Sequence, residues 1–150
     1  MDIYLKKVNY NDVDLLFRWA NEKEVRENAF STNKIEYCKH LDWFKNKMED
    51  SNSMIYIAYF KESAVGQIRV DIDNKIGLIT YSVDKEFRKK GIGTKILFEI
   101  QKKSFVGVQS LVGYVKKENV ASIKAFKRAG FSEVIEEKFN RYSLILEKEV

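Results

Sequence analysis

The segment Arg88-Lys89-Lys90-Gly91-Ile92-Gly93-Thr94 lies between a run that alternates like a β-strand and a run with helical periodicity. Its two glycines let the main chain approach a ligand closely, and the first N–H groups of a helix have no acceptor within the helix. The helix dipole adds about half a positive charge at that end. The segment therefore predicts a phosphate-binding corner at the start of a helix over residues 91–104, with basic side chains at its rim.

Known phosphate motifs do not match this corner. It lacks the Gly-Lys-Ser/Thr ending of a Walker A loop, and it lacks the third glycine of the dinucleotide fingerprint. Short glycine motifs also recur by accident, so a plain helix start with solvated basic residues is the alternative interpretation.

Periodicity on both sides of the corner predicts the other elements. Strands are predicted over 3–8, 54–60, 65–73, 76–83, 111–115, 131–136 and 142–146. Helices are predicted over 13–20 with Asn11 as cap, over 35–48 beginning near Ser31 or Thr32, over 91–104 and over 119–129. The strand–helix–strand order over 76–115 requires a parallel pair, whereas the successive strands over 54–83 favour antiparallel pairing. The fold class is α/β (α+β), a mixed, mostly antiparallel sheet of about seven strands flanked by about four helices.

Composition restricts the class of protein. A chain of 150 residues with 45% hydrophobic and 33% charged residues predicts one globular domain over 1–150. The net charge of +5 favours anionic ligands, while the scattered basic pairs argue against nucleic acid. No apolar run is long enough for a membrane span, and Met1-Asp2-Ile3-Tyr4 does not resemble a signal peptide. With only Cys38 and one histidine, we expect no disulfide, no metal site and a cytoplasmic protein, monomeric or homodimeric.

A second motif follows the corner at a characteristic separation. It reads Asn119-x-x-Ser122-x-x-x-Phe126-x-x-x-Gly130-Phe131. With Arg88-x-x-Gly91-x-Gly93 and the order of elements, it resembles the GCN5-related N-acetyltransferase family. The resemblance implies the fold of that family, acetyl-CoA as cosubstrate, and a V-shaped opening between the strands over 76–83 and 111–115. It also implies a set of cofactor-binding residues: Tyr81, Ser82 and Val83 along the pantetheine arm, Arg88, Lys89, Lys90, Gly91, Ile92, Gly93 and Thr94 at the pyrophosphate, and Asn119, Ser122 and Phe126.

Only some of the family's catalytic groups have counterparts in this chain. A main-chain N–H near Val83 is the expected oxyanion donor in a direct transfer from thioester to amine. Many members have a tyrosine as acid where this chain has Phe126, and a glutamate where it has Tyr114. By position, Ser82, Tyr114 and Tyr81 are the local substitutes, although each is equally well explained as an ordinary sheet residue.

Polar residues in three segments predict the acceptor site. The segments are Arg18-Trp19-Ala20-Asn21 through Arg26, His40-x-x-Trp43-Phe44, and Gly66-Gln67-Ile68-Arg69 with Asp71. In the strand over 65–73, Gln67, Arg69 and Asp71 share one face, which is either a solvated face or the wall of a pocket. His40 has an ordinary pKa suited to taking a proton from an ammonium, but a lone helical histidine is more often packed or at the surface.

These segments also resemble a narrower group, the N-acetyltransferases of nucleotide-linked 4-amino-4,6-dideoxy sugars in the pseudaminic and legionaminic acid pathways. That resemblance implies a nucleotide sugar as the small-molecule amine substrate, surrounded by Arg18, Asn21, Arg26, His40, Trp43, Gln67 and Arg69.

Other functions stay open on the sequence alone. The acceptor of the acetyl group is alternatively the N-terminus of a ribosomal protein, a polyamine or an aminoglycoside. A non-catalytic acyl-CoA-binding protein is the alternative from another class, because Phe126 and Tyr114 depart from the family pattern. Cys38 is expected to be inert, since a direct transfer needs no acyl-cysteine.

Overall fold

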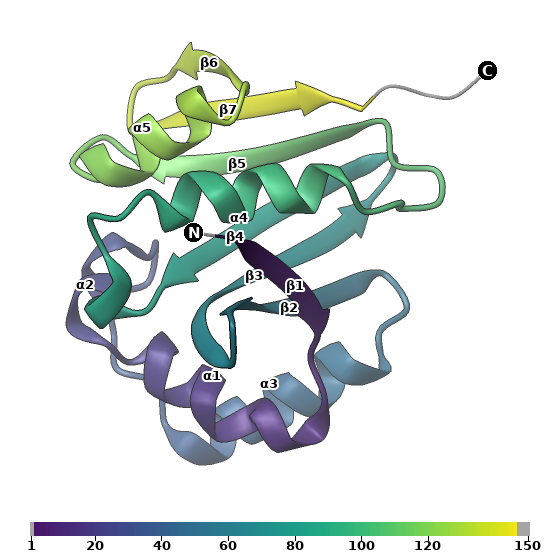
Figure 1. Ribbon diagram of the computed structural model, residues 1–150, viewed down its shortest axis with the longest axis vertical. Helices are drawn as coiled ribbons and strands as arrows, with labels where there is room; N and C mark the ends of the chain where they lie inside the picture. Colours follow the sequence, from purple (N-terminus) through teal and green to yellow (C-terminus); the bar gives the residue numbers. More distant parts are fainter. Residues whose placement is uncertain (1, 147–150) are drawn as a thin grey trace.

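Seven strands form one sheet in the computed structural model, which describes residues 2–146 (Figure 1). The strands are β1 (Ile3–Lys7), β2 (Ser53–Phe60), β3 (Ser63–Asp73), β4 (Ile76–Val83), β5 (Ser110–Lys116), β6 (Ser132–Ile135) and β7 (Phe139–Ile145). They lie in the order β1-β2-β3-β4-β5-β7-β6. Only β4 and β5 pair in parallel, and the other neighbours are antiparallel. The predicted mixed, mostly antiparallel sheet is confirmed.

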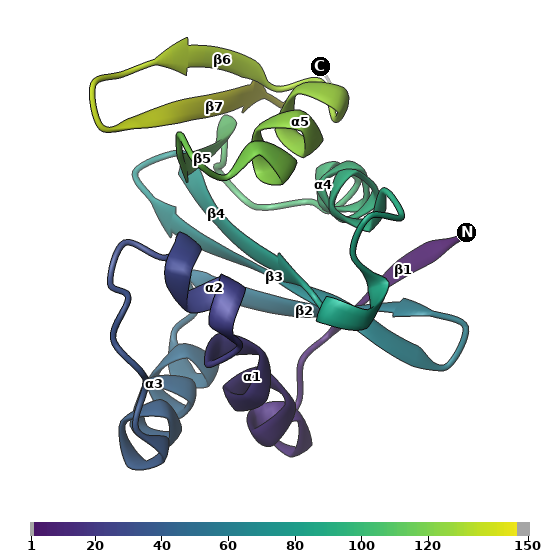
Figure 2. The same cartoon turned by 90° about the vertical axis from the view of Figure 1, so that its left-hand side faces the viewer.

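Helices cover both faces of the sheet (Figure 2). They are α1 (Val13–Ala20), α2 (Lys23–Asn28), α3 (Tyr37–Glu49), α4 (Ile92–Gln101) and α5 (Val120–Arg128), with single 3-10 turns η1 (Tyr10–Asp12) and η2 (Lys85–Phe87). Helices α4 and α5 lie on one face, and α1, α2 and α3 lie on the other. Helix α2 was not predicted, because its six residues contain a single apolar side chain, Val25, and so have no amphipathic period. No helix in residues 2–146 has the length and apolarity needed to cross a membrane.

Alternation along the strands divides the apolar residues between two cores. The larger core lies under α4, whose Ile92, Ile96, Leu97 and Ile100 are all at most 1% exposed. Burying each such side chain stabilises the fold by about 1.5–3 kcal/mol relative to leaving it in water. The smaller core packs α1 and α3 on β2 through residues such as Leu16, Phe44 and Ile57. Helices therefore pack on both faces of the sheet and stabilise it. Its central strands thus form a fixed support for a site.

The predicted starts of two helices need correction. Asn9, not Asn11, is the capping residue: its side chain accepts from Asn11 N at 2.8 Å and stabilises η1 ahead of α1. Helix α3 starts after Glu36, so Ser31 and Thr32 belong to the preceding loop. Asn119 caps α5, since its side chain accepts from Ser122 N at 3.3 Å, and its contact with a cofactor stays a prediction.

Candidate active site

Strands β4 and β5 are paired only over their first half. Their parallel register joins residues 76–78 to residues 110–112 and goes no further. Beyond it, β4 is still paired with β3 as far as Val83, and β5 with β7 as far as Lys116. The two strands therefore diverge and leave the main-chain groups of residues 79–83 and 113–116 without partners in each other. We call this region the strand split, and it confirms the predicted V-shaped opening.

The corner between β4 and α4 presents main-chain N–H groups. Gly91 is the N-cap of α4 with a left-handed φ of 75°, and no side chain of residues 2–146 caps this end. The first helical bond runs from Lys95 N to Gly91 O at 3.3 Å, so the N–H groups of Ile92, Gly93 and Thr94 have no acceptor in the helix. A Cβ at Gly91 would meet nothing within 4 Å, so no other residue packs against this side of Gly91. This geometry suits a pyrophosphate.

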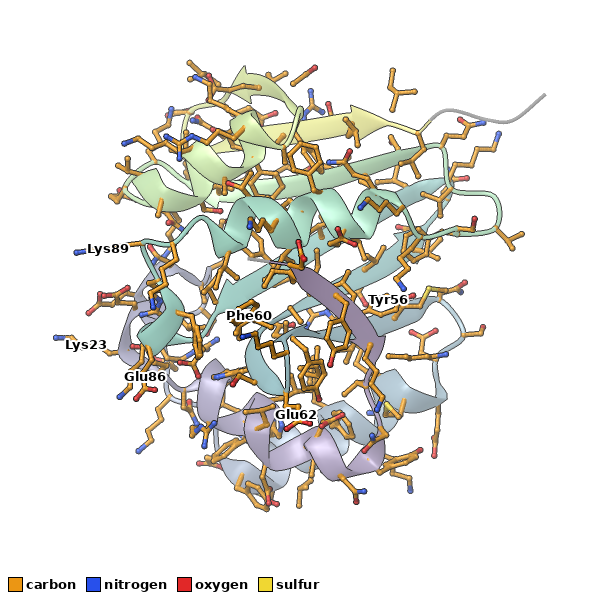
Figure 3. The ribbon with its side chains drawn as sticks, in the orientation of Figure 1. Lys23, Tyr56, Phe60, Glu62, Glu86 and Lys89 are labelled. Carbon is orange, nitrogen blue, oxygen red and sulfur yellow. The ribbon has the colours of Figure 1, made fainter. Side chains whose placement is uncertain are left out.

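The three basic residues of the corner have different surroundings. Lys89 projects outward at the edge of the molecule where Lys23 also projects (Figure 3). Lys90 Nζ lies 5.6 Å from the centre of the Phe87 ring. Arg88, in contrast, pairs with Glu22 at 2.6 Å and with Glu24 at 2.9 Å. The Arg88 hydrogen bond holds the pKa of Glu22 below its ordinary value. Arg88 thus joins the corner to α2, and the expectation that it supplies free positive charge at the rim is corrected.

Tyr81 lies on the α4 and α5 side of the split. A Cβ at Gly93 would be 3.2 Å from the Tyr81 ring, so the ring lies flush against the start of α4. The Tyr81 hydroxyl donates to Ser122 Oγ at 2.9 Å. Burial raises the pKa of Tyr81 to about 12, so the hydroxyl stays protonated at neutral pH. Tyr81 and Ser122 thus connect β4 with the start of α5, at the positions where the sequence predicted cofactor contacts.

The Phe126 side chain borders the split and belongs to the larger core. It is 2% exposed, stacks on Tyr142 with ring centres 5.1 Å apart, and meets Tyr81 edge to face at 5.7 Å. Its ring lies directly on Gly113, where a Cβ would be 2.8 Å from Cε1. The burial of Phe126 explains its place in the motif by packing, and its contact with a cofactor stays a prediction.

The opposite face of the split carries the predicted polar wall. Gln67 Nε2 donates to Ser82 Oγ at 3.1 Å across β3 and β4. Arg69 lies over the Trp43 ring at 5.1 Å and donates to Asp71 at 2.8 Å. The structure thus brings Gln67, Arg69, Trp43 and Ser82 to one face beside the split, as the alternation of the strand predicted.

Two hollows lie at the open end of the split. One, of about 320 Å³, lies at the end of β4 and is lined by Arg18, Trp19, Glu22, Lys23, Val25, Val83, Asp84, Lys85 and Arg88. The other, of about 420 Å³, lies at the end of β5 and is lined by Glu27, Phe30, Lys116, Glu118, Lys138 and Phe139. Helix α2 contributes to both. The ion pair of Arg88 connects α2 to the β4 side. On the β5 side, Lys116 Nζ donates to Glu27 O at 3.2 Å.

Asn21 and Arg26 are bound to the main chain instead of being free for a substrate. Asn21 exchanges two hydrogen bonds of 2.8 Å with the main chain of Ile35. Arg26 donates to the carbonyls of Ala20, Ser31 and Asn33. Both side chains shape the loop over 29–36, which borders the second hollow. Their role in binding a nucleotide sugar stays a prediction.

His40 also has a structural environment. It is 3% exposed, its ring stacks on Trp43, and its Nε2 is 2.9 Å from Val13 O. Burial lowers the pKa of His40, although the bond to Val13 opposes this. The expectation that His40 is an accessible proton acceptor is therefore corrected, and we do not include it in the chemistry proposed below.

The burial of His40 predicts a pH dependence of stability. Its folded pKa lies below the ordinary value of 6.5, so the unfolded chain binds more protons between these two values. Stability should therefore fall as the pH falls below about 6.5. His40 is the only histidine, so His40→Phe should remove this slope. Urea unfolding of both proteins from about pH 5.5 to 7.5 tests this, and equal slopes in the two would contradict it.

Sequence reasoning missed the second hollow. Phe30 lies in a polar loop without periodicity. Lys138 directly precedes β7, which begins at Phe139 although its strand was predicted to start at residue 142. A large aromatic residue within a polar loop was the one available signal. Within residues 2–146 no group of His, Cys, Asp or Glu side chains is arranged to hold a metal ion, and Cys38 is exposed.

Comparisons with known proteins agree with this geometry. The family model described as acetyltransferase (GNAT) domain matches residues 2–132. The acetyltransferase PseH of Campylobacter jejuni is 28% identical over 138 residues, which cover 88% of this chain and 84% of that protein. Its structure with acetyl coenzyme A has a TM-score of 0.73 at 23% identity, covering 97% of this chain and all 100% of that one. A spermidine N-acetyltransferase from Vibrio cholerae, solved with CoA and spermine, has a TM-score of 0.84 at 12% identity and covers 96% and 95%.

Proposed function

The chain belongs to the acetyltransferase (GNAT) domain family and is an N-acetyltransferase that uses acetyl-CoA; on this premise we propose that its acceptor is the amine of a nucleotide-linked amino sugar. The observation that carries the proposal is the strand split. It joins an anion-binding corner on one face of the sheet to a polar, partly hollowed surface on the other. A cofactor whose pyrophosphate is held at the corner thus places its thioester in the split, within reach of an amine on the opposite face.

The cofactor side is proposed to bind through the main chain. The N–H groups of residues 92–94 donate to the oxygens of the pyrophosphate at the start of α4, with Lys89 and Lys90 near the same corner. The unpaired edge of β4 at Tyr81, Ser82 and Val83 pairs with the amides of the pantetheine arm, as an added strand would. The acetyl thioester supplies the activated acyl group.

On the acceptor side the chain has to position a neutral amine and stabilise an oxyanion. We propose that the main-chain N–H near Val83 donates to the tetrahedral oxygen. Ser82, held by Gln67, and Tyr114 on the facing strand are the polar groups nearest the amine in this proposal. Positioning alone lowers such barriers by about 7–11 kcal/mol in favourable cases. The lack of a hydroxyl at Phe126 therefore does not argue against catalysis.

Three observations support a nucleotide sugar as acceptor. The chain is 28% identical to the acetyltransferase PseH. It has the segments that resemble nucleotide-sugar N-acetyltransferases. Glu22, which lines the first hollow, and the nearby Glu24 both pair with Arg88, and this weakens the case for a polycation such as spermidine.

A panel of acceptors tests the proposal. The protein is incubated with acetyl-CoA and, separately, a UDP-linked 4-amino-4,6-dideoxy sugar, spermidine, an aminoglycoside and a peptide with a free N-terminus, while release of the CoA thiol is followed. We expect kcat/KM for the sugar nucleotide to exceed the others by about a hundredfold or more, since a site built for polar groups discriminates strongly. A higher kcat/KM for another amine would overturn the proposed identity of the acceptor. Tight CoA binding without thiol release for any amine would favour the non-catalytic alternative.

A further inference from the structure

We propose that Phe30, Tyr114 and Phe139, with Lys116 and Lys138, form a subsite for the nucleoside diphosphate part of the acceptor. This inference rests on the proposed function and specifies where its substrate lies. We call the three rings the aromatic cluster.

The aromatic cluster lies on the acceptor face, next to the split. Tyr114 directly follows Gly113, and because side chains alternate along a strand it points away from the face on which Phe126 covers Gly113. Tyr114 meets Phe139 of β7 edge to face, with ring centres 5.3 Å apart. Phe30, from the loop after α2, also meets Phe139 edge to face, with ring centres 5.3 Å apart. Three distant segments thus place their rings side by side.

These rings remain exposed even though they pack on one another. Phe30 is 62% exposed and Tyr114 is 39% exposed. Loop 29–36, which carries Phe30, is held in place by the hydrogen bonds of Asn21 and Arg26. A fixed, exposed aromatic surface is what a planar base stacks on, because every base offers a π-face.

The charged groups of the second hollow match the rest of a nucleotide. Lys138 makes no ion pair with any residue of 2–146, and Lys116 is held by a main-chain carbonyl. Both ammonium groups thus remain uncompensated by a carboxylate bond and are available to phosphate. The carboxylates of Glu27 and Glu118 also line the hollow, and carboxylates accept hydrogen bonds from ribose hydroxyls.

The order of these groups along the strands matches the order of amino sugar, diphosphate and base in the ligand. Tyr114 borders the split, and Lys116 lies two residues further, about 7 Å along β5, opposite Phe139. A sugar whose amine is at the split would therefore place its diphosphate near Lys116 and Lys138. The base would then lie against Phe139 and Phe30.

Direct binding of UDP tests the subsite without depending on turnover. Calorimetric titrations with UDP, and separately with acetyl-CoA, are made on the wild type, Phe30→Leu, Lys138→Gln and Phe98→Leu. Phe98 is the control, since it is an aromatic residue 47% exposed on α4. We expect Phe30→Leu to raise the Kd of UDP about tenfold. Lys138→Gln should raise it and reduce its salt dependence, while Phe98→Leu leaves it unchanged. The Kd of acetyl-CoA should stay the same in all four proteins.

The outcomes separate the subsite from the proposed function. If UDP fails to bind, or binds Phe30→Leu as tightly as the wild type, the subsite is overturned, even if a UDP-amino sugar is still acetylated. If UDP binds with the expected losses but no UDP-amino sugar is acetylated, the subsite is supported and the proposed acceptor is wrong. An unchanged Kd for acetyl-CoA in Phe30→Leu shows that the variant is folded.

Discussion

Thr94→Pro is expected to weaken binding of coenzyme A about ten- to a hundredfold, which corresponds to the loss of one hydrogen bond to a charged group. Proline removes the N–H of residue 94 but breaks no helical bond, because the first such bond is made by Lys95 N. The residue before it is Gly93, which tolerates the restriction that proline imposes on its neighbour. The substitution therefore removes a proposed pyrophosphate contact while keeping the helix.

Thr94→Ala is the matched control for this prediction. It removes the side chain and keeps the amide, so the Kd of coenzyme A should change less than about threefold. Both values come from calorimetric titration, with far-ultraviolet circular dichroism to verify the helix content. If Thr94→Pro, still folded, bound coenzyme A as tightly as Thr94→Ala, the main-chain corner would not be the pyrophosphate site.

Gly113→Ala is expected to lower the free energy of unfolding by about 1–3 kcal/mol, the usual cost of overfilling a packed core. The added Cβ would overlap the Phe126 ring. That ring is enclosed by Tyr142 and Phe131 with ring centres 5.1 Å and 5.0 Å away, so it has little room to withdraw. The melting temperature should fall by roughly 2–4 °C for each kcal/mol.

The same substitution made in a Phe126→Leu protein tests whether the cost comes from overlap with the ring. Leucine at position 126 is shorter, so Gly113→Ala should cost less than half as much in a Phe126→Leu protein as in the wild type. Denaturant unfolding of the four proteins gives the coupling energy. Equal costs in both backgrounds would show that residue 113 and the ring do not compete for the same space.

The corner and the sheet were predictable because their signals are local. Strand alternation placed Gln67 and Arg69 together on one face, and Gly91 could be recognised as the point where a strand turns into a helix. Both features depend on residues adjacent in sequence. The split itself followed from the family resemblance, since nothing in the residues of β4 and β5 says where their pairing ends.

The partners of polar side chains were not predictable in the same way. The sequence marks Arg88, Asn21 and Arg26 as candidate site residues, but their residue type does not say what they bind. Arg88 is neutralised by Glu22, 66 positions away in sequence, and Arg26 is bound to loop carbonyls. Helix α2, which has Glu22 as its N-cap and Glu24 in its first turn, has no apolar stripe and depends on these tertiary contacts. The result is that α2 connects the cofactor corner with the acceptor hollows.

The central claim is that the corner and the split together hold acetyl-CoA. The most direct test is a titration of ¹⁵N-labelled protein with coenzyme A, followed by amide chemical shifts. We expect the largest shifts at residues 89–94, at Tyr81, Ser82 and Val83, and at residues 113–116 on the facing strand. Binding that shifts amides elsewhere and leaves both the corner and the split unchanged would contradict it.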